Sequence, residues 1–256
     1  MKKPASIVLL SFSGLLLLIL MGFNSQAQDT VYSKPFPHTG NWDDPGTWVG
    51  GNIPTQLQTV VIRSTVNLFS NETCNSLIIE YDGVLQTISG NRYLTTLGSI
   101  VNYGALKQVG GTFNLDVNGN ISQYGTWNIQ STEMKGPGNK NLSIGQNPII
   151  SREFKVFQPD AITAQTSLWF HDSQVDFNTK ILNLAKGDSL KCTFQNLNIY
   201  NRYIQRMTLN GDSSYLSLSN GGHIRDFVAN KMIVTGNTQI GDNDCVFNDY
   251  LIVLDT

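Results

Sequence analysis

Few residues in this sequence have both the type and the spacing that catalysis or metal binding requires. A local acidic cluster is formed by Asp242, Asp244 and Asp249, which follow Gly241. Carboxylate oxygens spaced in this way can bind Ca²⁺, but the residues match neither an EF-hand loop nor the nine-residue calcium repeat of solenoid proteins. We therefore interpret the cluster as a polar turn and expect no cofactor, with a Ca²⁺ site as the alternative.

The sequence contains no motif that arranges residues for nucleophilic catalysis. His38, His171 and His223 are far apart, and no G-x-S-x-G motif is present. A polysaccharide lyase would need a base beside a neutralised carboxylate, and a hydrolase would need two carboxylates facing one groove. The charged residues of the later half are scattered along the chain. We therefore expect no catalytic residues, with a lyase or glycoside hydrolase as the alternative.

Four aromatic residues are the candidates for ligand binding: Trp42, Trp48, Tyr103 and Tyr124. Flat aromatic faces suit sugar rings, so the two tryptophans could form a carbohydrate platform. The favoured interpretation is that they cap the open end of the first structural repeat and cover its apolar edges. The two tyrosines are 21 residues apart, which predicts that they stack if the chain coils with that period.

The elements that would position these residues are short strands. Apolar runs with a period of two recur between Gly, Asn and Asp residues, and no amphipathic helical pattern follows the N-terminal apolar run. Residues 94–104 align without a gap with residues 115–125, and five of the eleven positions are identical. Three columns extend the alignment back by one period: Ile79, Ile100, Ile121; Gly83, Gly104, Gly125; and Leu85, Leu106, Trp127.

A period of this length predicts a solenoid in which each coil is one repeat. Later in the chain, Met207 and Met232 are 25 residues apart, whereas Phe227 and Phe247 are 20 apart. The leucine-rich pattern with a fixed Asn is missing, so the predicted fold class is all-β, a right-handed parallel β-helix with about 20–25 residues per coil. A β-sandwich is the alternative. We expect the glycine column to provide corner conformations that other residues disfavour.

The N-terminus predicts export. Lys2 and Lys3 precede an apolar run over 7–23, and a small-residue cleavage site ends at Ala27, which is typical of a signal peptide over 1–27. We expect a lead-in over 28–39 and the β-helix over 40–256, with a loop-rich insertion at 131–170. The chain ends on a strand-like run, which leaves truncation open. The predicted location is secreted or cell-surface, with no membrane span after cleavage.

The amino-acid composition limits the classes of partner that this protein can bind. The chain has 17 basic and 19 acidic residues and a formal charge of −2, so it has no basic footprint for nucleic acid. The three cysteines, Cys74, Cys192 and Cys245, are far apart in the sequence. They form no metal-binding or redox motif, and we interpret them as small apolar core residues, with one disulfide as the alternative.

One segment resembles a known family. Gly40-Asn-Trp42-Asp-Asp-Pro45-Gly-Thr-Trp48, followed by Gly50-Gly51, Pro54 and the Val60-Val-Ile62 run, is similar to the opening of G8-type domains. It also resembles the N-terminal module of secreted surface proteins from Bacteroidota-like bacteria. The resemblance covers about residues 40–110. It implies a β-helical fold, an extracellular location and association with polysaccharide, and it brings no catalytic motif.

These observations predict an exported β-solenoid that serves in adhesion or in glycan or matrix binding. One face of the stacked coils would display exposed aromatic and polar side chains to an extended polysaccharide or surface ligand. The alternatives are an extracellular polysaccharide lyase or hydrolase on the same scaffold, and a structural spacer that binds nothing.

Overall fold

A computed structural model describes residues 29–185, 188–193, 203–210, 214–218, 223–235, 239–240 and 246–254. The predicted signal peptide over 1–27 lies outside these residues. Within the described ranges, no helix is both long enough and apolar enough to cross a membrane.

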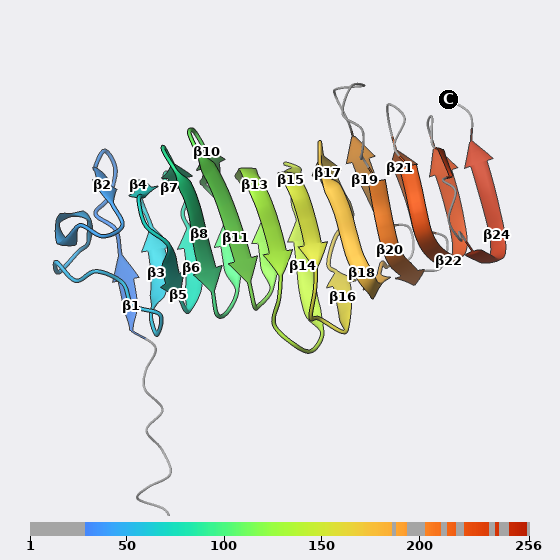
Figure 1. Ribbon diagram of the computed structural model, residues 1–256, viewed down its shortest axis with the longest axis horizontal. Helices are drawn as coiled ribbons and strands as arrows, with labels where there is room; N and C mark the ends of the chain where they lie inside the picture. The colour runs from blue at the N-terminus through green and yellow to red at the C-terminus, as the bar shows by residue number, and fades with distance from the viewer. Residues whose placement is uncertain are drawn as a thin grey trace, which may run out of the picture.

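The molecule is a parallel β-solenoid, which confirms the predicted all-β class and coiled repeat. Strands of successive coils lie side by side along the long axis, from the blue N-terminal end to the red end (Figure 1). Each coil runs through three sheets in turn, and each named strand pairs in parallel with strands of the neighbouring coils. Because one coil cannot bury its inward side chains alone, stability depends on stacking.

The strands are grouped by sheet. Sheet 1 contains β1 (Thr30–Tyr32), β3 (Thr59–Ile62), β6 (Ser76–Ile79), β9 (Ile100–Asn102), β12 (Ile121–Gln123), β14 (Lys140–Ile144) and β16 (Ala161–Ala164). Sheet 2 contains β2 (Thr39–Asn41), β4 (Thr65–Leu68), β7 (Val84–Thr87), β10 (Ala105–Gln108), β17 (Leu168–His171), β19 (Ser189–Thr193) and β21 (Ser214–Leu218). Sheet 3 contains β5 (Glu72–Cys74), β8 (Asn91–Thr96), β11 (Thr112–Val117) and β23 (Gln239–Ile240).

Longer strands bend around a corner and contribute to more than one sheet. They are β13 (Thr126–Met134), β15 (Ile149–Val156), β18 (Gln174–Asn183), β20 (Tyr203–Asn210), β22 (His223–Thr235) and β24 (Val246–Leu254). A single 3₁₀ turn, η1 (Pro45–Thr47), is described near the N-terminal end, and the carboxylate of Asp44 caps it by accepting a hydrogen bond from Gly46 N–H at 2.8 Å.

The 21-residue register is confirmed between the coils that contain β9 and β12, where Ile121 pairs with Ile100. Leu115 likewise pairs with Leu94. The backward extension through Ile79 is wrong, because Leu77 is the residue that pairs with Ile100. The corner after β6 has two more residues than the corner after β9. Residues before the corner therefore pair 23 positions apart, as Leu77 does with Ile100, whereas residues after it pair 21 apart, as Val84 does with Ala105.

The predicted register of the last coils is also wrong. Met207 pairs with Phe227 rather than Met232, and Met232 pairs with Leu251. Register shifts interrupt β18–β20 and β22–β24. Because one bulge changes the spacing on only one side of itself, a constant period read across these coils mixes two registers.

The stack continues through the segment 131–170, for which the sequence predicts loops. Parts of β13 and β17, with β14, β15 and β16 between them, lie in this segment and pair in parallel with the coils on either side. A turn over 135–139 interrupts the strands. Gly136, Pro137 and Gly138 therefore lie in a corner of a regular coil.

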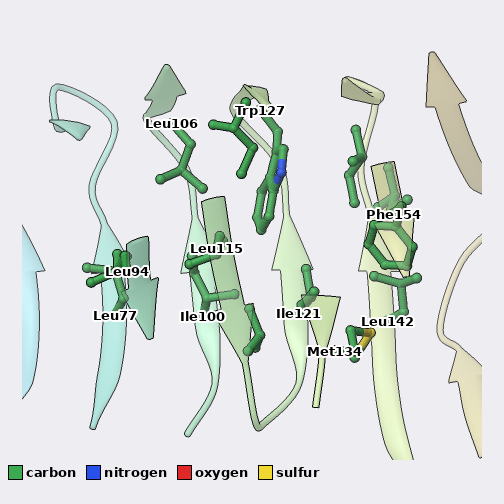
Figure 2. Packing of buried hydrophobic residues seen from close by; sticks show 14 of the residues in the cluster. Leu77, Leu94, Ile100, Leu106, Leu115, Ile121, Trp127, Met134, Leu142 and Phe154 are labelled. Carbon is green, nitrogen blue, oxygen red and sulfur yellow. The ribbon is translucent and has the colours of Figure 1, made fainter. Parts of the chain in front are cut away.

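The core is a set of columns of inward-facing side chains. Figure 2 shows buried residues of successive coils, including Leu106 and Trp127, packed between the strands. The predicted column of Leu85, Leu106 and Trp127 is confirmed, and Ile149 and Phe170 continue it. All five side chains are fully buried. Burial of one such side chain stabilises the fold by about 1.5–3 kcal/mol.

The glycine column has a different cause from the one that the sequence suggests. Gly83, Gly104 and Gly125 stack as predicted, but none of them has a positive φ. A Cβ on Gly104 would lie 2.2 Å from the carbonyl oxygens of Glu80 and Gly83. These glycines are therefore needed for the close approach of successive backbones. A positive φ occurs instead at another corner, at Gly90 and Gly111.

Candidate functional site

Exposed aromatic residues gather where the coils pass from sheet 1 to sheet 2. The predicted stack of Tyr124 on Tyr103 is confirmed, with ring centroids 5.2 Å apart and planes 10° apart. Tyr81 extends the stack, with its ring 5.4 Å from that of Tyr103 and tilted by 32°. We call these three residues the tyrosine ladder. Stacked aromatic pairs contribute about 0.5–1.5 kcal/mol beyond their buried area.

The 21-residue repeat does not identify Tyr81 as part of the stack, because Tyr81 lies in the longer corner. Gly83 N–H donates to the Glu80 carbonyl at 2.8 Å, which closes a turn with Tyr81 and Asp82 at its tip. Glycine is favoured at the last position of such a turn. The turn inserts the two extra residues and projects the Tyr81 side chain outward, with 81% of it exposed. In the sequence, the spacing of 22 residues between Tyr81 and Tyr103 is the feature that indicates the stack.

The two ends of the tyrosine ladder are not equivalent. Tyr103 lies between two rings and is 37% exposed, so it presents mainly its edge and hydroxyl. Tyr124 is 40% exposed, and a Cβ on Gly145 of the next coil would lie 2.9 Å from its Cδ1. The backbone of that coil therefore approaches the Tyr124 end. The most open ring of the ladder is Tyr81.

A cavity of about 540 Å³ lies beside this open ring. Its aromatic wall contains Phe36, Tyr81 and Tyr103, and we call it the aromatic cavity. Phe36 belongs to the segment between β1 and β2, and 70% of it is exposed. A cavity with apolar walls and a few polar groups is typical of small-ligand and sugar subsites.

Three charged residues also line the aromatic cavity: Arg63, Glu80 and Asp82. The Arg63 guanidinium lies 4.0 Å from the centre of the Tyr32 ring, and its Nε is 3.4 Å from Glu80 Oε1. Arg63 is therefore already engaged by an aromatic face and by a carboxylate. Among the ion pairs of the described residues, none includes Asp82.

The two tryptophans do not belong to this surface. Trp42 and Trp48 are both buried, with ring centroids 5.3 Å apart and planes 76° apart. Trp48 Nε1–H donates to the Trp42 carbonyl at 2.8 Å. A sugar cannot stack on a buried ring. The burial of Trp42 and Trp48 therefore contradicts the alternative interpretation, in which they form a carbohydrate platform. Their position in the first coils, in the hydrophobic core, agrees with the favoured capping interpretation.

The acidic cluster predicted from the sequence lies mostly outside the described residues. Asp242 and Asp244 lie outside the described residues, and Asp249 lies in β24, where only the backbone is described. The described part of the chain contains no group of three or more His, Cys, Asp or Glu residues placed to hold a metal ion. The expectation of a polar turn, with Ca²⁺ as the alternative, stays a prediction.

A second, more polar cavity of about 220 Å³ lies on sheet 3 and is lined in part by Asp116, Glu133 and Glu153. Lys135 Nζ is 2.8 Å from Asp116 Oδ2 and 3.0 Å from Glu133 Oε2, and Lys155 pairs with Glu153. Burial lowers the pKa of Lys135, but the hydrogen bonds that its ammonium group donates to Asp116 and Glu133, together with the charges of these carboxylates, outweigh burial and raise this pKa. All three carboxylates are thus ion-paired.

Comparison with protein-family models, with curated proteins and with solved structures gives no match for this chain. The resemblance of residues 40–110 to G8-type domains therefore stays a prediction. The ligand class must be inferred from the geometry of the tyrosine ladder and the aromatic cavity.

Proposed function

We propose that this protein binds glycans at the cell surface or in the surrounding matrix, and that the tyrosine ladder and the aromatic cavity are its binding site. The observation that carries the proposal is the open Tyr81 ring, which lines a cavity of about 540 Å³ together with the exposed Phe36. A sugar ring has an apolar C–H face that packs on an aromatic ring and hydroxyl groups that hydrogen-bond to phenols and carboxylates.

In this proposal one sugar unit packs against Tyr81 and Phe36 inside the aromatic cavity. The glycan then runs along the tyrosine ladder, where the exposed edges and hydroxyls of Tyr103 and Tyr124 are available for hydrogen bonds. The three tyrosines lie in corners between paired β-strands, and the stacking of each ring on the next orders the ladder before the ligand arrives. Preorganisation of this kind lowers the entropic cost of binding.

Two features of the sequence support an extracellular role. The N-terminal pattern over 1–27 is typical of an export signal. The opening of the chain also resembles modules of secreted surface proteins that are associated with polysaccharide. These features and the solenoid scaffold support adhesion through repeated surface contacts as part of the proposal.

The test is retention of the purified protein on a panel of immobilised and soluble polysaccharides, with Tyr81→Ala compared with Tyr93→Ala. Tyr93 is a matched control because it is 44% exposed but lies on β8, away from the tyrosine ladder. We expect Tyr81→Ala to weaken binding by about fivefold or more, since truncation of an aromatic anchor at a binding hot spot costs over 1 kcal/mol. Tyr93→Ala should bind like the wild type.

Equal binding by the wild type and Tyr81→Ala would exclude the tyrosine ladder as the site. Retention on none of the polysaccharides would instead favour the spacer alternative. Release of shorter sugars during the same incubation would favour the lyase or hydrolase alternative.

A further inference from the structure

The charges around the aromatic cavity discriminate between classes of sugar. Two carboxylates, Glu80 and Asp82, face one guanidinium, that of Arg63. Arg63 lies against the Tyr32 ring and beside Glu80. A carboxylate ligand would meet a cation that already has partners, and it would lie near two like charges.

A cationic ligand would find the opposite environment. The faces of aromatic rings carry partial negative charge and attract ammonium groups. Tyr81 and Phe36 provide such rings, and Asp82 lies beside Tyr81 at the tip of the same turn. The described ion pairs do not include Asp82, so its carboxylate is available to a ligand.

We propose that the aromatic cavity selects glycans that contain amino sugars with a free ammonium group, in preference to acidic glycans. This inference rests on the proposed function and names the ligand class of the same site. The C–H face of the amino sugar packs on Tyr81 and Phe36, and its ammonium group pairs with Asp82, with Glu80 nearby. No covalent step is involved.

The experiment compares three oligosaccharides of equal length: a glucosamine oligomer, an N-acetylglucosamine oligomer and a galacturonate oligomer. The first two have the same backbone and differ in the charge of the nitrogen substituent. We expect the glucosamine oligomer to bind about two- to fivefold more tightly than the acetylated one at low salt, as for one exposed ion pair. The galacturonate oligomer should bind most weakly. The difference should shrink as added salt screens the charges.

Two variants locate the preference. Asp82→Asn should reduce the preference for the glucosamine oligomer over the N-acetylglucosamine oligomer, because only Glu80 and the aromatic rings then attract the ammonium group. Asp160→Asn should keep the preference, because Asp160 is exposed but does not line the aromatic cavity. Both changes remove one negative charge from the protein, so any effect of net charge is the same in each.

The outcomes separate this inference from the proposed function. Equal binding of the three sugars, or tightest binding of galacturonate, overturns the inference and leaves glycan binding intact. Loss of the preference in Asp160→Asn as well as in Asp82→Asn also overturns it, because the selection would then come from net charge. Binding of none of the three overturns the inference, whereas the proposed function fails only if the protein is also retained on none of the polysaccharides of the panel.

Discussion

At the scale of single residues, exposure separates the aromatic side chains into two roles. Trp42 and Trp48 are buried and hold the first coils together, whereas Tyr81, Tyr103 and Tyr124 are exposed in the tyrosine ladder. The same residue property, a large flat ring, therefore serves packing at one site and surface display at the other. The side on which each ring emerges from its coil decides between the two.

Two of the three cysteines are the core residues that the sequence predicts. Cys74 and Cys192 are buried and unpaired, and Cys245 lies outside the described residues. Burial raises the pKa of the Cys74 thiol from 9.0 to about 12, with a smaller contribution from the charge of Glu72. Burial also raises the pKa of the Cys192 thiol.

This shift predicts a loss of stability in alkali. The unfolded Cys74 thiol ionises from pH 9.0 upward, whereas the folded thiol stays neutral until about pH 12. The contribution of this thiol to stability is therefore complete below pH 9.0 and is lost as the pH rises toward 12, by at most about 1.4 kcal/mol per pH unit. Urea unfolding at pH 8, 10 and 11 should show a steeper loss in the wild type than in Cys74→Ala. An identical dependence of the free energy of unfolding on pH in the two proteins would contradict the prediction.

At the scale of elements, the corners determine which residues stack. The corner between β6 and β7 contains Glu80, Tyr81 and Asp82 before Gly83. The corresponding corner after β9 contains only Tyr103 before Gly104, the glycine that stacks on Gly83. The two extra residues create the turn that builds the aromatic cavity. They also bring Asn102 over Ile79, so the core column there changes from apolar to polar.

Gly104 is the position at which this corner tolerates least change. A Cβ at Gly104 would lie 2.2 Å from two backbone oxygens, so Gly104→Ala must push the coils apart. We expect a loss of about 1–3 kcal/mol in the free energy of unfolding, as for an overpacked core. Gly46→Ala is the control, because its nearest neighbour at 3.1 Å is the carboxylate of Asp44, an exposed side chain. Urea unfolding measures both variants, and equal stability of the two would contradict the close-approach explanation.

At the scale of the whole molecule, the solenoid is a chain of nearest-neighbour interfaces. Stability in such a fold is a sum over coils and the interfaces between them, so a local defect loosens its own region first. The tryptophan pair lies at the N-terminal end of this series, where the indole Nε1–H of Trp48 donates a hydrogen bond to the Trp42 carbonyl.

Trp48→Ala should therefore loosen the first coils before the rest. The change leaves a cavity and costs about 3–5 kcal/mol locally. Hydrogen exchange should speed up in β1 to β4, while β9 to β15 keep their protection. Val49→Ala is a matched control, since the neighbouring Val49 side chain is exposed and its truncation should cost within about 0.5 kcal/mol. Uniform acceleration of exchange along the whole chain would indicate a single cooperative unit instead.

Much of this fold can be predicted from the amino-acid sequence, because stacking places like residues one coil apart. The match of residues 94–104 with 115–125 is enough to predict parallel coils, the Leu85, Leu106 and Trp127 column and the stack of Tyr103 with Tyr124. These features depend on spacing that is constant over adjacent coils. The pairing of Ile100 with Leu77 and the place of Tyr81 in the tyrosine ladder could not be predicted in this way. They depend on how many residues each corner holds and on which side a ring emerges, and both are settled by the packing of one coil on the next.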